Sequence, residues 1–248
     1  MDPVRLGVAF LVVFVAALGK GYSGFGFNLM AVGGLSLILA PSDAVPIVLI
    51  LAAVSSVHLL PQVWREVNWR SLWLLMGAAV AATPVGVVLL RRVPAAPMRI
   101  VISLLVLAAA ALLWSGVTWS QRRGPASTIA MGVASGLLNG STGVSGPPVI
   151  LFYFASFPTL SIARASLIAY FLGTDASAVA IAATQGIVTR EVLLRCAVLL
   201  PGLVLGIALG HRGFLHAPRD TARRALVGLL VLLGVGGLVR GLYEWTAS

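Results

Sequence analysis

The chain alternates between long hydrophobic runs and short polar connections. Charge-free runs extend over Ser71–Leu90, Ile100–Gln121 and Gly124–Ala163. A helix needs about 20 predominantly apolar residues to cross a bilayer, so runs of this length indicate membrane-spanning helices rather than core helices of a soluble domain. The pattern therefore predicts an all-α integral membrane protein that crosses the membrane several times.

Ten helical segments can be drawn from this pattern, five in each half of the chain. They are Val4–Leu18, Phe27–Ala40, Ala44–Val63, Ser71–Leu90 and Met98–Trp119, followed by Ala126–Leu138, Pro147–Phe157, Ser161–Thr184, Glu191–Gly210 and Thr221–Val239. The first two segments of each half are shorter than a bilayer crossing requires, and the other three are full length. We expect roughly 8–10 membrane segments in total.

The two halves resemble each other as an internal repeat of roughly 120 residues. Gly21, Ser23 and Gly24 align with Gly140, Thr142 and Gly143, Pro41 aligns with Pro158, and Gly86 aligns with Gly206. We therefore divide the chain into a first transmembrane repeat (residues 1–120), a short basic linker (121–125) and a second transmembrane repeat (126–248).

The relative orientation of the two repeats depends on their short segments. If each short pair forms a re-entrant hairpin or two tilted crossings, each half crosses an odd number of times and the halves are inverted. If each pair is one broken helix, the halves run parallel. Both arrangements divide the Lys and Arg residues almost evenly between the two sides, so the positive-inside rule does not choose between them. Inverted repeats are a common transporter architecture, and on that precedent we expect them here.

One glycine-rich stretch interrupts the apolar pattern in each half, Gly19–Asn28 (GKGYSGFGFN) and Gly136–Pro148 (GLLNGSTGVSGPP). A broken helix frees backbone groups that lipid cannot satisfy, so such a segment persists where protein buries it or where it lines a watery cavity. Interrupted helices at matching places in two halves point to the binding site of a transporter. We predict the substrate site between the two stretches. Close helix packing is the alternative interpretation, and for any single glycine it is the favoured one.

The second stretch, taken with its echo and the paired halves, resembles the TauE/SafE family, also called the sulfite exporter or TSUP family. The resemblance covers nearly the whole chain and is carried by the run Asn139–Pro148 and by Pro158 with Ala163–Ser166. The first half departs from the family's run of consecutive glycines, because Tyr22, Phe25 and Phe27 interleave there. The resemblance implies a secondary transporter that exports small anions such as sulfite, organosulfonates or related carboxylates.

An anion of this class needs several convergent hydrogen-bond donors. The start of a helix supplies backbone N–H groups and the positive end of a dipole, and the segments that begin at Phe27 and Pro147 both follow a glycine break. Hydroxyl and amide side chains supply further donors. The candidate substrate-binding residues are Lys20, Tyr22, Ser23, Gly24, Asn28, Asn139, Gly140, Ser141, Thr142, Gly143, Ser145, Gly146 and Arg164.

Two cations close to these stretches each have two interpretations. Lys20 is the only lysine of the chain; it complements an anion if it lies inside the membrane, or its long stem snorkels to the interface. Arg164 opens its segment, where its guanidinium either binds a sulfonate or anchors the helix at the interface.

An aspartate and a histidine in apolar runs are candidates for proton coupling. Asp175 stands in the middle of a charge-free run, where a carboxylate is costly and usually functional; a hydrogen bond to Thr174 or Ser177 is the structural alternative. His58 falls opposite Asp175 when Pro41 and Pro158 are aligned, whereas neighbouring alignments place Ser55 or Ser56 there. Both residues could carry protons coupled to anion movement, although an ordinary helix histidine is the favoured interpretation of His58.

Composition narrows the functional class. The chain is 59% hydrophobic and 10% charged, far from the roughly 25% charged residues of soluble proteins. Its net charge of +10 comes from arginines in short loops, which fits membrane orientation and lipid headgroups better than nucleic acid. A single cysteine, Cys196, excludes an intramolecular disulfide and a multi-cysteine metal site. We expect no cofactor, no metal and no nucleic-acid partner.

The family resemblance, taken with these observations, implies a secondary transporter of a small anionic substrate in the cell (inner) membrane, not an enzyme. A passive anion channel is the alternative, because it would use the same donors without a coupling group. An intramembrane enzyme built from His58, Asp175 and a serine is disfavoured, because no nucleophile motif accompanies them.

Overall fold

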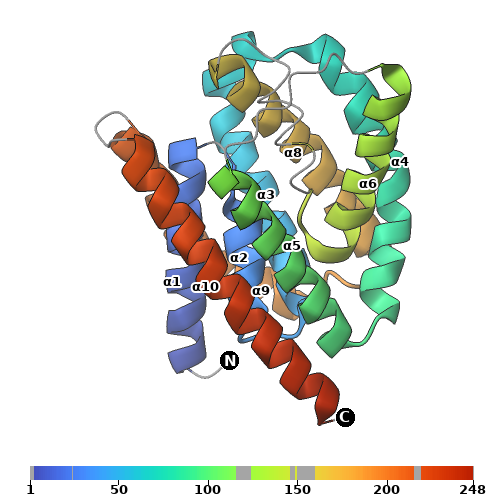
Figure 1. Ribbon diagram of the computed structural model, residues 1–248, viewed down its shortest axis with the longest axis vertical. Coiled ribbons are helices and arrows are strands. Elements are labelled where there is room, and N and C mark those ends of the chain that lie inside the picture. The colour runs from blue at the N-terminus through green and yellow to red at the C-terminus, as the bar shows by residue number, and fades with distance from the viewer. Residues whose placement is uncertain are drawn as a thin grey trace.

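The computed structural model describes residues 3–23, 25–115, 124–145, 149, 160–214 and 219–247. These residues form α-helices joined by short connections, and no strand occurs among them (Figure 1). The helices are α1 (Pro3–Ser23), α2 (Phe27–Leu35), α3 (Pro41–Val63), the short 3-10 helix η1 (Trp64–Glu66), α4 (Trp69–Arg92), α5 (Ala95–Ser115), α6 (Pro125–Thr142), α8 (Leu160–Thr184), α9 (Arg190–Phe214) and α10 (Arg219–Thr246).

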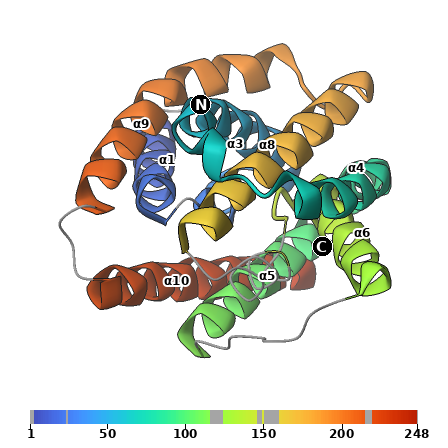
Figure 2. The same cartoon turned by 90° about the horizontal axis from the view of Figure 1, so that it is seen from above.

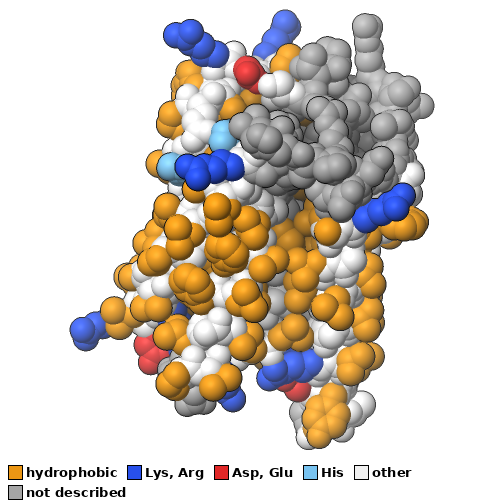
Figure 3. Space-filling view, turned by 90° about the vertical axis from the view of Figure 1, so that its left-hand side faces the viewer, with side chains coloured by type: hydrophobic (Ala, Val, Ile, Leu, Met, Phe, Trp, Pro, Cys, Tyr) orange, Lys and Arg blue, Asp and Glu red, His pale blue; other side chains and the backbone are white. Residues whose placement is uncertain are grey.

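Seven of the described helices are long and apolar enough to cross a membrane, namely α1, α3, α4, α5, α8, α9 and α10. Many large hydrophobic side chains on them are exposed, among them Leu11, Trp73 and Leu232. Figure 3 shows such side chains over the middle of one face, with charged side chains towards its two ends. An apolar middle between polar ends is the surface that a lipid bilayer covers. The protein is therefore an all-helical, multi-pass membrane protein.

The expected full-length segments agree with the observed helices to within a few residues, apart from the longer α10. The first segment of each half differs more: α1 extends to Ser23 and α6 extends to Thr142, beyond the predicted ends at Leu18 and Leu138. Both helices therefore continue into the glycine-rich stretches. The predicted segment Pro147–Phe157 lies outside the described residues, apart from Val149.

Glycines allow the extended ends of α1 and α6 to pack closely against other helices. A Cβ atom on Gly140 of α6 would collide with the backbone of α4 at Thr83 and Val87, and one on Gly21 of α1 would lie 2.5 Å from the carbonyl oxygen of Ile207 on α9. Gly86 of α4 and Gly206 of α9 meet the backbones of α6 and α1 in the same way. Close packing is thus what these four glycines provide.

The most extensive helix contacts join α1 with α9, α4 with α6, α3 with α8 and α5 with α10. Figure 2 shows α3 and α8 near the centre, with α1 and α9 on one side of them and α4 and α6 on another. Every one of these pairs joins a helix of the first half to a helix of the second. Residues far apart in the sequence therefore meet in the interior.

A buried arginine holds the end of the short helix α2. Arg99 of α5 is 3% exposed, and its guanidinium donates to the carbonyl oxygens of Ser36 (Nε, 2.7 Å) and Leu39 (Nη2, 3.1 Å) just after α2. It also forms an ion pair with Glu244 of α10. Unsatisfied carbonyls at a helix end are stabilised by such a cation, so α2 is tied to the α5–α10 pair.

Candidate functional site

Each of the two glycine breaks contains a residue with left-handed backbone. Gly26 has φ of 91° and directly precedes α2, and Gly143 has φ of 71° and ends α6. Residues with a Cβ rarely adopt this region, which is why glycine occupies both turns. At Gly143 the N–H donates to the carbonyl oxygen of Asn139 at 2.8 Å, as in the common glycine termination of a helix.

The two breaks lie in direct contact. The side-chain amide of Asn28, in the first turn of α2, donates to the carbonyl oxygen of Gly143 at 2.8 Å, although these residues are 115 positions apart in the sequence. The same Nδ2 group donates to Oδ1 of Asp175 on α8 at 3.3 Å. Asn28 therefore links the first break, the second break and the buried carboxylate.

Asp175 is fully buried at this meeting point. The Asn139 side chain lies near enough to act electrostatically on its carboxylate, although beyond hydrogen-bonding distance. Neither Asn139 Nδ2 nor Asp175 Oδ2 has a partner at hydrogen-bonding distance in the part of the chain that the structure describes. Because buried polar atoms are normally hydrogen-bonded, these two atoms mark a place where a proton or a ligand atom would add a bond.

Lys20 supplies the positive charge of the same cluster. Its side chain is 1% exposed, and Nζ donates to Ala52 O at 3.1 Å and Ser56 Oγ at 2.9 Å, both on α3. The charge of Lys20 acts on Asp175, and Nζ lies 5.9 Å from the ring centre of Phe27. The snorkelling interpretation is therefore wrong for this conformation. Lys20 also belongs to helix α1 rather than to a break.

A chain of polar groups supports the second break. Ser145 Oγ donates to Asn139 Oδ1 at 2.9 Å. Ser135 Oγ donates to the carbonyl oxygen of Ser145, and Tyr170 OH of α8 donates to Ser135 Oγ at 2.7 Å. Ser135 and Tyr170 were not candidates from sequence, because isolated hydroxyls in apolar helices carry no distinguishing spacing. Ser56 was considered there only as a possible equivalent of Asp175 in the other half.

A small cavity of about 20 Å³ lies inside this cluster. Lys20, Asn28 and Ser145 form its polar lining, and Phe27 and Phe171 are among its apolar lining residues. A cavity needs at least about 10–15 Å³ of this kind of volume to hold a water molecule. The cavity thus has room for about one water.

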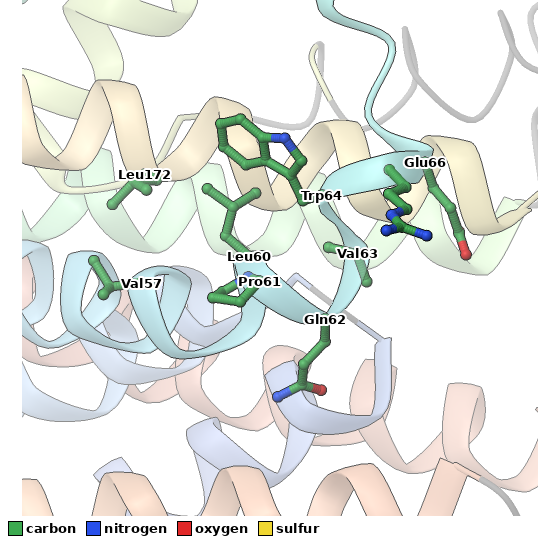
Figure 4. Close-up of a pocket in the computed structure, with 9 residues that line it drawn as sticks. Val57, Leu60, Pro61, Gln62, Val63, Trp64, Glu66 and Leu172 are labelled. Carbon is green, nitrogen blue, oxygen red and sulfur yellow. The ribbon is translucent and has the colours of Figure 1, made fainter.

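A second and larger hollow, of about 710 Å³, lies at the end of α3 (Figure 4). Val57, Leu60 and Trp64 line it together with Leu172 of α8. Leu172 directly follows Phe171, which lines the small cavity. The two cavities therefore lie against the same turn of α8.

Several other predicted site residues have structural partners instead. The hydroxyls of Ser141 and Thr142 donate back to Leu137 O (2.8 Å) and Leu138 O (2.7 Å) of their own helix, and Gly140 packs against α4. The side chains of Tyr22 and Ser23, and the residues Gly24 and Gly146, lie outside what the structure describes.

Arg164 and His58 are not part of the Lys20–Asp175 cluster. Arg164 Nη2 donates to the carbonyl oxygen of Gly21 at 3.1 Å, and its charge interacts with Glu66. His58 is exposed on α3, whereas Ser56 faces Lys20. Two residues are about 200° apart around a helix, so His58 points away from the face that carries Ser56. The structure therefore does not bring His58 and Asp175 together as predicted.

Comparison with known proteins identifies the family. The chain matches the sulfite exporter TauE/SafE family over residues 9–236. It is 30% identical to a protein of Cupriavidus necator named probable sulfite/organosulfonate exporter TauE, over 93% of this chain and 94% of that protein. No solved structure matches the chain. The chain belongs to the sulfite exporter TauE/SafE family of membrane transport proteins.

Proposed function

We propose that this protein is a secondary transporter of the cell (inner) membrane that exports small sulfur-containing anions, such as sulfite, organosulfonates or related carboxylates. The observation that carries the proposal is the contact between the two glycine breaks, Asn28 Nδ2 to Gly143 O, beside the buried Lys20 and Asp175. Ionisable residues buried in a membrane protein usually mark the pathway of a substrate or a proton. The name of the Cupriavidus necator relative supports this substrate class.

The first turn of α2 supplies donors suited to an anion. The first N–H groups of any helix have no partner within the helix, and at the start of α2 Gly26 has no side chain that could cap them. The positive end of the helix dipole lies at the same place. Lys20 and Asn28 line the cavity beside this turn. A sulfite or sulfonate oxygen would find a cation, an amide and backbone donors together.

A two-fold relation between the halves accounts for the helix pairings and is compatible with alternating access. We propose that residues 1–120 and 126–248 are inverted repeats. Exchanging the halves converts the α1–α9 pair into the α6–α4 pair, and it leaves α3–α8 and α5–α10 as pairs of equivalent helices. This exchange supports a two-fold relation, and a site near the axis of such a relation becomes exposed to either side as one group of helices moves against another.

The small size of the cavity favours a carrier over the alternative passive channel. A space for about one water is too small for a sulfonate with its several heavy atoms, so the residues around it must rearrange before substrate enters. A carrier therefore shows counterflow, in which anion on the far side accelerates uptake of labelled anion, whereas a channel shows none.

Transport and binding in purified protein test the proposal. Wild-type protein in proteoliposomes should exchange labelled sulfite or a sulfonate, and binding of the same anion should raise the melting temperature in detergent. Asn139→Leu and Ser145→Leu should abolish binding while insertion into the membrane is retained. Gln185→Ala, which removes an amide after α8, is the matched control and should behave as wild type. Exchange by both leucine variants at the wild-type rate would contradict the proposed site.

A further inference from the structure

Asp175 holds one of the donors that an anionic substrate needs, and it interacts with two others. Its carboxylate accepts from Asn28 Nδ2 and interacts with Asn139 and with the charge of Lys20. A carboxylate and a sulfonate are both small anions with several oxygen acceptors, so they compete for the same amides and the same ammonium group. When no substrate is bound, the carboxylate of Asp175 therefore takes the place of the substrate anion.

The cluster has no net charge while Asp175 is ionised. Lys20 is the cation, and both residues are buried. Among the residues that the structure describes, the other groups of the cluster are neutral: Asn28 from α2, which donates to Asp175 and to the Gly143 carbonyl, Asn139 from α6, and Ser56 of α3, the hydroxyl that accepts from Lys20. On α4, Met76 approaches Gly173. The charged pair Arg164 and Glu66, near the start of α8 and in η1, is about three helical turns away along α8.

The neutral equivalents of both charged residues lie in the opposite half. Lys20 and Asn139 directly precede Gly21 and Gly140, which occupy matching positions in the α1–α9 and α6–α4 contacts. Ser56 and Asp175 are separated by the same distance along the sequence as Lys20 and Asn139. Lys20 bonds to Ser56, and Asn139 interacts with Asp175. The two halves thus use the same arrangement. One half has Lys20 where the other has Asn139, and one has Asp175 where the other has Ser56, so the positive and the negative charge balance each other.

We infer that Asp175 is an internal competitor of the substrate, so that a monoanion binds together with one proton that neutralises Asp175. This inference rests on the proposed function. The proton comes from water on the side to which the site is open, forms an O–H bond on the carboxyl, and leaves to water on the other side with the anion. The Asn28 amide then turns from the carboxyl to the substrate, and Lys20 and the Asn139 Nδ2 group, which has no partner among the described residues, add their donors to it. One proton moves with one monoanion, so no net charge crosses the membrane. The direction of transport is then set by the concentration gradients of the substrate and of protons.

Binding measurements with methanesulfonate in nanodiscs test this coupling. A sulfonate keeps its single charge across pH 5–9, so any proton that is taken up belongs to the protein. Calorimetry of the wild type in two buffers with different ionisation enthalpies should show uptake of about one proton per anion at neutral pH. The apparent affinity should fall about tenfold for each pH unit once Asp175 is ionised in the empty site. Methanesulfonate binding without proton uptake would overturn the inference and leave the proposed function standing.

Substitution of the carboxylate provides the second test. Asp175→Asn should bind methanesulfonate at every pH at least as tightly as the wild type does at low pH, with no proton uptake. Asp43→Asn, which removes a carboxylate from the start of α3 where it pairs with Arg195, is the matched control and should keep the wild-type pH dependence. Loss of binding in a folded Asp175→Asn protein would show that the carboxylate is a ligand rather than a competitor. If Asp175→Asn does not fold, proton uptake by the wild type decides. Failure of sulfite, sulfonates and carboxylates alike to bind the wild type at any pH would instead refute the proposed function, and the inference with it.

Discussion

Replacing Lys20 by asparagine, the residue at the matching position of the second half, removes the positive charge from the buried cluster. Two hydrogen bonds from Nζ, to Ala52 O and Ser56 Oγ, are lost, and Asp175 keeps no buried cation. Breaking a buried pair by removing one partner costs about 3–5 kcal/mol, because the remaining charge is uncompensated. Protonation of Asp175 limits this cost, so we expect about 3 kcal/mol at neutral pH and less in acid.

The double variant Lys20→Asn/Asp175→Ser supplies the decisive comparison. It gives both positions the neutral residues of the other half, and it should recover most of the stability that the single variant loses. Thermal unfolding in detergent measures the difference, which for a chain of this size corresponds to about 6–12 °C if the soluble-protein scaling holds. Equal melting temperatures for the single and double variants, or a single variant that is no more stable at pH 5 than at pH 8, would refute the charge-balance argument.

Three further substitutions test other parts of the structure. Asn28→Leu should remove the stabilisation by bound anion, since its amide joins Gly143 to Asp175; a melting-temperature shift equal to that of the wild type would contradict this role. Gly140→Ala should cost about 1–3 kcal/mol in unfolding experiments because its Cβ meets the backbone of α4, whereas Gly77→Ala, with nothing near its Cβ, should be neutral or slightly stabilising. Arg99→Met should lower both stability and transport, by about 3 kcal/mol or more in stability; wild-type transport would show that the anchor of α2 is dispensable.

Hydrophobic run lengths were sufficient to predict the long helices, because the bilayer imposes one length on every crossing. They were not sufficient for the ends of α1 and α6. The sequence Gly19–Ser23 looks like a helix breaker when glycine is judged by propensity alone. In the structure Gly21 packs against α9, and this tertiary contact keeps the segment helical.

The candidate site was partly predictable from individual residues. Lys20 and Asp175 stand out because each is an ionisable residue in apolar sequence, and Gly143 stands out within its motif. Their juxtaposition was not predictable from one sequence, since it depends on how helices from two halves pack. The alignment through Pro41 and Pro158 placed His58 opposite Asp175, whereas the register of Gly21 and Gly140 places Ser56 there, and Ser56 is the residue that bonds to Lys20.

The tie between Arg99 and the end of α2 connects one side of the site to the α5–α10 pair. Asn28 belongs to α2, which Arg99 ties to that pair, while Asp175 belongs to α8, which packs on α3 and α4. We expect a displacement of α5 and α10 relative to α8 to strain the hydrogen bond between Asn28 and Asp175. A short covalent cross-link between α2 and α8 at the level of this bond should therefore prevent the movement and abolish transport.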